Sequence, residues 1–182
     1  MLPFRNLPFQ LVIATATVVL ANVVLNTSNF VVAESKKTVV TTMDYLHLEN
    51  VRASEITVGT RNTNYIFTIN IPKTSKPIEK VLITQRGRVE QIQFNGRVRA
   101  AGSSAEQKKI EVSKVEIDRQ MKGIIATFNP SVQPGQRLTV TLGVKENPIS
   151  DGNYLFDVAV VPEGKSEAIS LGIGRLRITS IR

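Results

Sequence analysis

The sequence predicts an all-β fold, an antiparallel two-sheet sandwich of immunoglobulin-like type, preceded by an N-terminal signal-peptide segment. Three observations support it. After Glu34, apolar residues recur at every second position, which is the pattern of half-buried strands. No segment has the periodicity of a useful amphipathic helix, so two sheets must cover each other. Turn-forming residues separate the apolar runs at intervals typical of a sandwich.

The first 33 residues have the layout of a secretory signal peptide. Arg5 is their only charged residue, an apolar run extends from Leu11 to Leu25, and small side chains at Val31-Val32-Ala33 suit a signal peptidase. At about 15 residues, the run is shorter than the roughly 20 needed to span a bilayer. We therefore expect cleavage after Ala33 and a single domain over residues 34–182, with a retained membrane anchor as the alternative.

Three long runs predict the clearest strands. Within each run, four large apolar residues share one parity, as on the buried face of a strand. The three sets are Tyr65, Phe67, Ile69 and Ile71; Leu138, Val140, Leu142 and Val144; and Tyr154, Phe156, Val158 and Val160. Their aromatic members fall in phase with the aliphatic ones, so we expect them in the core and not on a sugar-stacking surface.

Shorter runs complete the expected sheets. They are Val81 and Ile83; Ile92 and Phe94; Ile124, Ala126 and Phe128; and two outer strands at Val39–Met43 and Ile169–Ile181. Between Ile110 and Ile117 the apolar residues change parity, because Ile110 and Val112 alternate in one phase and Val115 and Ile117 in the other. A bulge or strand break near Ser113-Lys114 would keep all four inside.

Turn chemistry marks the connections. Asn95-Gly96 is typical of a tight hairpin turn, and Pro134-Gly135 fits a type II turn. Pro72 ends one strand, while Asn147-Pro148 and Asp151-Gly152 bracket another connection.

Composition narrows the function. The chain has 182 residues and no cysteine, which excludes disulfides, thiol catalysis and thiolate metal sites. Its net charge of +8, from 23 basic and 15 acidic residues, favours anionic partners, and we expect an anionic envelope component or another envelope protein. Because the chain is expected to be exported, nucleic acid is not an expected partner.

The basic residues between positions 86 and 122 suggest where such a partner would bind. Arg97 and Arg99 share one strand face, and Arg86 and Arg88 are placed to cap the same expected hairpin. If the four converge, they form a patch suited to carboxylate or phosphate groups. The alternative is a scattered, solubilising surface, since acidic residues partly offset the basic ones. The whole basic set is Arg86, Arg88, Arg97, Arg99, Lys108, Lys109, Lys114, Arg119 and Lys122.

Catalytic and metal motifs are weak. Asp44, His47 and Glu49 combine the only histidine with two acids, but a zinc site needs more ligands than one histidine and one carboxylate on a shared face. No Gly-x-Ser-x-Gly elbow occurs, and Gly172-Ile173-Gly174 lacks the third glycine of a phosphate-binding loop. We therefore expect a non-enzymatic protein without a cofactor.

Two alternatives stay open. One is a metal carrier or enzyme with a loop-built site around Asp44, His47 and Glu49, whose mark would be a pocket that brings together two or more of these residues and Asp151. The other is a cell-surface or matrix component that assembles through edge strands.

A family resemblance supports this interpretation. The segments Ile66–Pro72 and Pro77–Gln85 resemble the opening of a cyanobacterial family of exported proteins of unknown function. The closing half resembles it further, in the segments Pro134–Leu142, Asn147-Pro148, Gly152–Phe156 and Leu171–Leu176. The resemblance implies a periplasmic or otherwise extracytoplasmic β-sandwich, in the periplasm, the thylakoid lumen or at the cell surface, with no assigned catalytic residues. Asp151-Gly152 stands where the family tends to have paired glycines, which affects only the turn.

Overall fold

Ten strands form the part of the chain that the structure, a computed structural model, describes: residues 44–87, 90–103 and 109–180. In chain order they are β1 (His47–Ala53), β2 (Asn64–Ile71), β3 (Ile78–Arg86), β4 (Phe94–Gly102), β5 (Lys109–Ile110), β6 (Val112–Asp118), β7 (Gly123–Val132), β8 (Gln136–Val144), β9 (Gly152–Pro162) and β10 (Ile169–Ile178). The signal segment and the expected strand Val39–Met43 lie outside the described residues. Within the described residues, no apolar helix of membrane-spanning length occurs.

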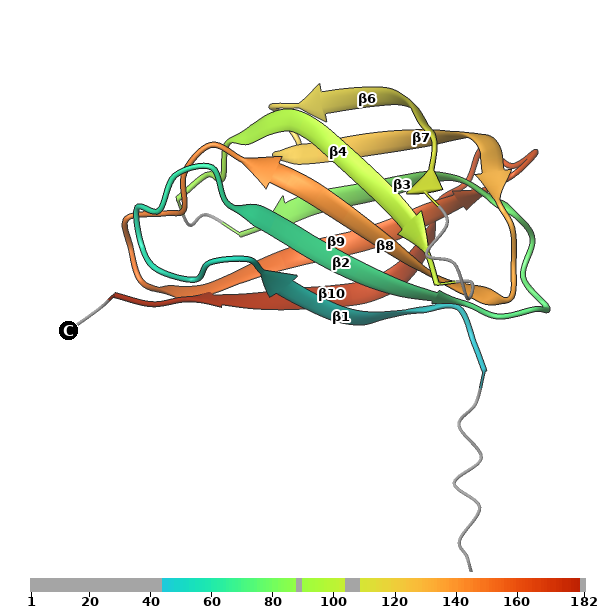
Figure 1. Cartoon of the computed structure of the whole chain (residues 1–182), viewed down its shortest axis with the longest axis horizontal. Helices are drawn as coiled ribbons and strands as arrows, with labels where there is room; N and C mark the ends of the chain where they lie inside the picture. The colour runs from blue at the N-terminus through green and yellow to red at the C-terminus, as the bar shows by residue number, and fades with distance from the viewer. Residues whose placement is uncertain (1–43, 88–89, 104–108, 181–182) are drawn as a thin grey trace, which may run out of the picture. The chain divides into compact units, whose positions relative to one another are not determined.

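The strands form two five-stranded antiparallel sheets that lie face to face (Figure 1). The first sheet has the order β1-β2-β8-β4-β5 and the second the order β10-β9-β3-β7-β6. The predicted all-β, two-sheet sandwich is therefore confirmed. At one side of the sandwich β1 packs over β10, and at the other β4 lies near β6.

The core consists of the alternate residues that the sequence pattern selects. The rings of Tyr65 and Phe67 on β2 both meet Phe156 on β9 edge to face, with centroids 5.9 and 5.4 Å apart. These contacts join the two sheets, because β2 and β9 belong to different ones. The aromatic residues are fully buried, as predicted.

A buried polar network closes one end of the sandwich. The hydroxyl of Tyr65 donates to Oδ1 of Asn147 over 2.9 Å. The amide of Asn147 donates to the carbonyl oxygens of Glu55 at 3.0 Å and Thr57 at 2.8 Å. Burial raises the pKa of the Tyr65 phenol, because the phenolate would lose its hydration. The network thereby ties the β1–β2 and β8–β9 connections to the core.

The predicted hairpin turn at Asn95-Gly96 is wrong. Both residues lie inside β4, whose pairing with β8 shifts register between Phe94 and Val98. Gly96 has a φ of +80°, a conformation that glycine adopts both in bulges and in tight turns. Nor do β3 and β4 form a hairpin: they belong to different sheets, so the chain between them crosses the sandwich.

The parity change after Ile110 has its predicted cause. A break at Glu111 separates β5 from β6, and the β6–β7 pairing shifts register between Val112 and Lys114. One part of the expectation is wrong, since Ile117 is 44% exposed. Its side chain faces the inner side of its sheet but lies beside the beginning of β4, where the opposite sheet covers it only in part.

Candidate ligand-binding cleft

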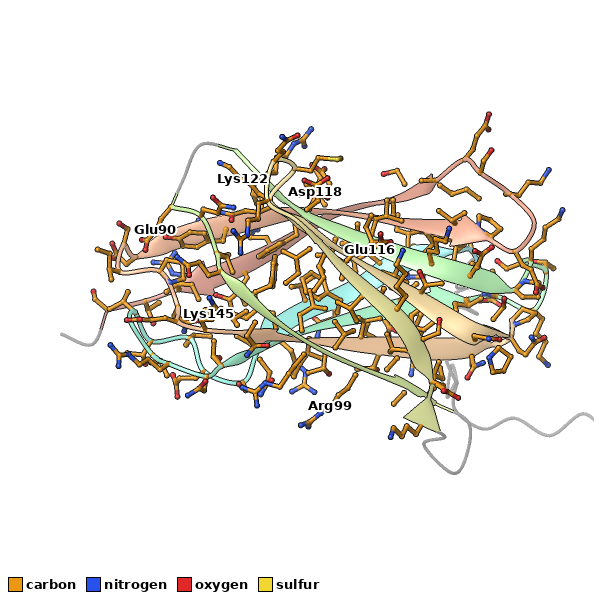
Figure 2. All side chains as sticks on the ribbon, turned by 90° about the horizontal axis from the view of Figure 1, so that it is seen from above. Glu90, Arg99, Glu116, Asp118, Lys122 and Lys145 are labelled. Atoms are coloured by element: carbon orange, nitrogen blue, oxygen red, sulfur yellow. The ribbon has the colours of Figure 1, made fainter. Side chains whose placement is uncertain are left out.

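A hollow of about 350 Å³ lies between the start of β4 and the end of β6. Figure 2 looks onto this side of the sandwich, with Lys122 and Asp118 on one flank of the hollow and Lys145 on the other. We call it the β4–β6 cleft. Its lining consists of Gln91, Ile92, Gln93, Phe94, Ile117, Asp118, Arg119, Lys122, Gly123 and Lys145.

The floor of the cleft is apolar. Ile92 and Phe94 are buried members of the core, and Ile117 on β6 is the half-exposed residue between them and solvent. Gly96 borders this floor: a Cβ there would lie 3.7 Å from Cδ1 of Ile117, so a side chain at position 96 would contact Ile117.

Gln85 holds the floor in place. It is the core-facing residue before the end of β3 and is only 4% exposed. Its Nε2 donates to the carbonyl oxygen of Glu90 over 2.7 Å, and its Oε1 accepts from the backbone N–H of Ile92 over 2.8 Å. One side chain thus satisfies two backbone groups of the β3–β4 connection, which places Ile92 against the core.

The β6–β7 turn is tied to the same strand. The N–H of Gln85 donates to the carbonyl oxygen of Lys122 over 3.0 Å, and the ammonium of Lys122 donates to the carbonyl oxygen of Gly87 over 3.4 Å. Asp118 turns its carboxylate back into its own turn, where Oδ1 accepts from the N–H groups of Gln120 and Met121, each at 2.9 Å.

Positive charge is in excess around the cleft. Arg119, Lys122 and Lys145 line it together with one acid, Asp118. None of the five ion pairs between described residues includes any of these three cations. An anionic group in the cleft would therefore meet cations that no described carboxylate neutralises.

A neighbouring hollow of about 280 Å³ extends the cleft toward the β8–β9 connection. The two share Gln91, Gln93 and Lys145. The two acids on this side, Glu90 and Glu146, already bind protein groups. Oε2 of Glu90 accepts from the N–H groups of Ile149 at 3.0 Å and Ser150 at 3.3 Å, and Oε2 of Glu146 lies 3.5 Å from Nε of Arg61.

The arginines predicted to converge do not form one patch among the described residues. Arg86 lies on β3 and pairs with Asp157 on β9, with Nε and Oδ2 3.5 Å apart. Arg97 and Arg99 are exposed on β4, in the other sheet, and Arg99 points away from the cleft (Figure 2). The outer faces of the two sheets point in opposite directions, which separates Arg86 from the other two. Arg88 lies outside the described residues.

The residues of the alternative metal site bind other groups. Nδ1 of His47 donates to the carbonyl oxygen of Tyr45 over 2.7 Å, and Asp44 accepts from the amide of Asn70 over 3.0 Å. Glu49 pairs with Arg137 over 2.8 Å. Asp151 directly precedes β9, which begins at the end of the sandwich opposite the beginning of β1 (Figure 1). No cluster of three or more potential metal ligands occurs among the described residues.

Sequence reasoning did not find the cleft, although one signal for it exists. Gln85 shares the parity of Val81 and Ile83, so it is a polar residue at a core position. Such a residue needs buried partners, which predicts a connection folded back onto the strand. By contrast, no local pattern brings Lys145 beside Arg119 and Lys122.

Comparison with known families gives one match. A model described as protein of unknown function (DUF2808) matches residues 38–178. The expected relation to a family of unknown function is thereby confirmed, whereas a cyanobacterial origin and a signal peptide stay predictions. No curated protein sequence matches the chain.

Solved structures with a similar arrangement of strands belong to bacterial surface proteins. The collagen-binding domain from a Staphylococcus aureus adhesin is 10% identical, with a TM-score of 0.45 over 74% of this chain and 96% of that one. The N-terminal domain of a Streptococcus gordonii adhesin is 8% identical, with a TM-score of 0.49 over 74% of this chain and 32% of that one. The major pilin subunit of Bacillus cereus is 11% identical, with a TM-score of 0.45 over 74% and 41% of the two chains.

Proposed function

We propose, on the premise that the chain belongs to the DUF2808 family of proteins of unknown function, that it is a non-enzymatic binding protein of the extracytoplasmic space. Its partner is an anionic component of the cell envelope, held at the β4–β6 cleft. Residues 1–33 direct export and are removed after Ala33, which leaves residues 34–182 as the mature domain of an envelope protein, as expected for the cyanobacterial family that the sequence resembles.

The observation that carries this proposal is the excess of cations over an apolar floor. Exposed ion pairs are each worth about 0.2–1 kcal/mol, so three together supply about 0.6–3 kcal/mol toward an anionic partner. This electrostatic free energy is enough to distinguish anionic from neutral partners of the same shape. It decreases at high salt, because dissolved ions screen the charges.

Arg97 and Arg99 give a long partner a second contact. They are exposed on β4, beyond the cleft, and no ion pair between described residues involves them. A polyanion that leaves the cleft along β4 would reach them. Arg86 contributes less, because Asp157 already neutralises it.

A titration with polygalacturonate, a soluble polycarboxylate, tests the proposal. The protein is residues 34–182, which contain every described strand and the whole described core. We expect amide chemical shifts of ¹⁵N-labelled protein to change around the cleft at about 50 mM NaCl and to return to their free values at about 500 mM.

Two matched charge reversals locate the binding. Lys145→Glu, at the cleft, is expected to weaken binding about three- to tenfold, because an attraction becomes a repulsion. Lys165→Glu, in the exposed β9–β10 connection, serves as control and should change binding less than twofold. Shifts spread evenly over the surface, or equal losses in both variants, would contradict a cleft-centred function.

A further inference from the structure

The edge strand β6 has one side without a described partner. It pairs only with β7 and is the last strand of its sheet. From Lys114 to Asp118 the pairing with β7 is regular, one residue opposite one. Alternate N–H and C=O groups of an edge strand point away from its single partner, so β6 presents a row of backbone groups without a described partner to an incoming strand.

The neighbouring strand β4 is a poorer acceptor. Its bulge at Gly96 disrupts the spacing of its backbone groups, and the N–H of Arg97 already donates to Oδ1 of Asn95 over 2.9 Å. The short strand β5 covers β4 only at Ala100 and Ala101. Strand addition on this side of the sandwich is therefore favoured at β6.

The cleft lies where the side chains of an added strand would point. Ile117 faces the inner side of its sheet, so the inward side chains of a strand next to β6 would lie beside it and above Phe94. A volume of about 350 Å³ accommodates a few side chains and not a whole folded partner. Apolar residues at every second position of the partner would fill it.

Charge decides which partner fits. The rim carries Arg119, Lys122 and Lys145 with one acid, and the whole chain has a net charge of +8. A second copy of this chain would bring more positive charge to a positive rim. Acidic residues at the end of the segment beside the β6–β7 turn would meet the three cations that lack a described ion-pair partner. Along β6 itself, the outward side chains of the segment would lie beside Lys114 and Glu116, which already pair with each other.

We propose that an extended, acidic segment of another protein adds to β6 as a further antiparallel or parallel strand, with its apolar side chains in the β4–β6 cleft and its carboxylates at the cationic rim. The proposal rests on the proposed function and names the partner class. Backbone hydrogen bonds supply affinity and the alternate pockets supply specificity, as in other strand additions.

The test uses an end-capped, fluorescein-labelled peptide of alternating valine and threonine with two glutamates at each end, long enough to cover β6. Fluorescence anisotropy measures its affinity for residues 34–182. Two further peptides carry N-methyl groups on two alternate amides, in one phase or in the other. Because only one phase faces β6, methylation there should weaken binding about five- to hundredfold, and methylation in the other phase less than twofold.

Variants of the protein test whether the peptide binds at the β4–β6 cleft. Gly96→Asn adds a side chain beside Ile117 at a residue type that tolerates a positive φ, and it should weaken binding at least fivefold. Lys145→Glu should weaken it about three- to tenfold, with Lys165→Glu as the unchanged control. Circular dichroism verifies that the variants keep the wild-type fold.

Equal sensitivity to the two N-methyl phases, or sensitivity to neither, would overturn strand addition. If polygalacturonate shifts the cleft residues while the peptide does not bind, the anion-binding function stands and strand addition falls. If neither probe affects the cleft, both proposals fall. A concentration-dependent dimer in light scattering that the peptide dissociates would make a second copy the occupant and would also overturn the proposal.

Discussion

Removing the polar atoms of Gln85 should destabilise the protein by breaking its two hydrogen bonds to the β3–β4 connection. Gln85→Met keeps the length of the side chain but removes the acceptor for the Ile92 N–H and the donor to the Glu90 carbonyl. The Ile92 N–H is buried, so leaving it without a partner costs about 1–3 kcal/mol; the partly buried Glu90 carbonyl loses about 0.5–1.5 kcal/mol. We expect the free energy of unfolding to fall by about 1.5–4.5 kcal/mol, measured by urea denaturation.

Gln85→Glu makes the hydrogen bonding at this position depend on pH. A protonated glutamic acid reproduces both, since its O–H donates to Glu90 and its other oxygen accepts from Ile92. An ionised one places a buried carboxylate against a carbonyl oxygen, so its folded-state pKa is raised above the unfolded value of about 4.3. Stability is therefore fully present below that value and is lost as pH rises, by about 1.4 kcal/mol per unit until the folded pKa is passed.

The comparison is made between each variant and wild type at each pH, which removes the titration of other groups. Gln133→Met and Gln133→Glu serve as controls, because Gln133 is exposed in the β7–β8 connection and should change stability by less than about 0.5 kcal/mol. A Gln85→Met loss as small as the control, or a Gln85→Glu deficit that does not grow with pH, would refute the role assigned to Gln85.

Two further predictions concern the core. A Cβ on Gly174 would overlap Cγ2 of Val51 on β1, so Gly174→Val should lower the free energy of unfolding by about 1–3 kcal/mol in urea denaturation, whereas exposed Ile173→Val should change it little. The raised pKa of Tyr65 means that stability is complete below its unfolded pKa of about 10 and falls as pH rises, by about 1.4 kcal/mol per unit. Tyr65→Phe should remove this part of the alkaline loss; an unchanged slope above pH 10 would contradict the buried phenol.

The core was predictable because its signal is local. Alternation along Tyr65 to Ile71 places residues on one face of a strand whatever that strand pairs with, and the structure buries the same face. Partners of strands are not a local property. The signal at Asn95-Gly96 suits a hairpin turn and a glycine bulge equally, and only the assignment of β3 and β4 to different sheets decides between them.

The cleft could not be predicted either, because its residues come from segments that are distant in the sequence. Arg119 and Lys122 belong to the β6–β7 turn, and Lys145 follows β8 in the other sheet. They line one hollow only because the sheets face each other, which is set by contacts between residues distant in the chain. The arginines that a sequence window brings together, Arg86 and Arg99, are separated by the same sheet assignment.

The two sides of the sandwich explain why a partner is to be expected at β6. Where β1 packs over β10, Gly174 allows so close an approach to Val51 that no side chain fits between them. Where β4 meets β6, Ile117 stays 44% exposed over an apolar floor. Burying an isoleucine fully is worth about 1.5–3 kcal/mol, so the free protein leaves about 1 kcal/mol of that unrealised at this one residue. A strand laid along β6 would cover Ile117 and at the same time satisfy the unpaired backbone edge, so the features that leave this side open are the ones that an added strand completes.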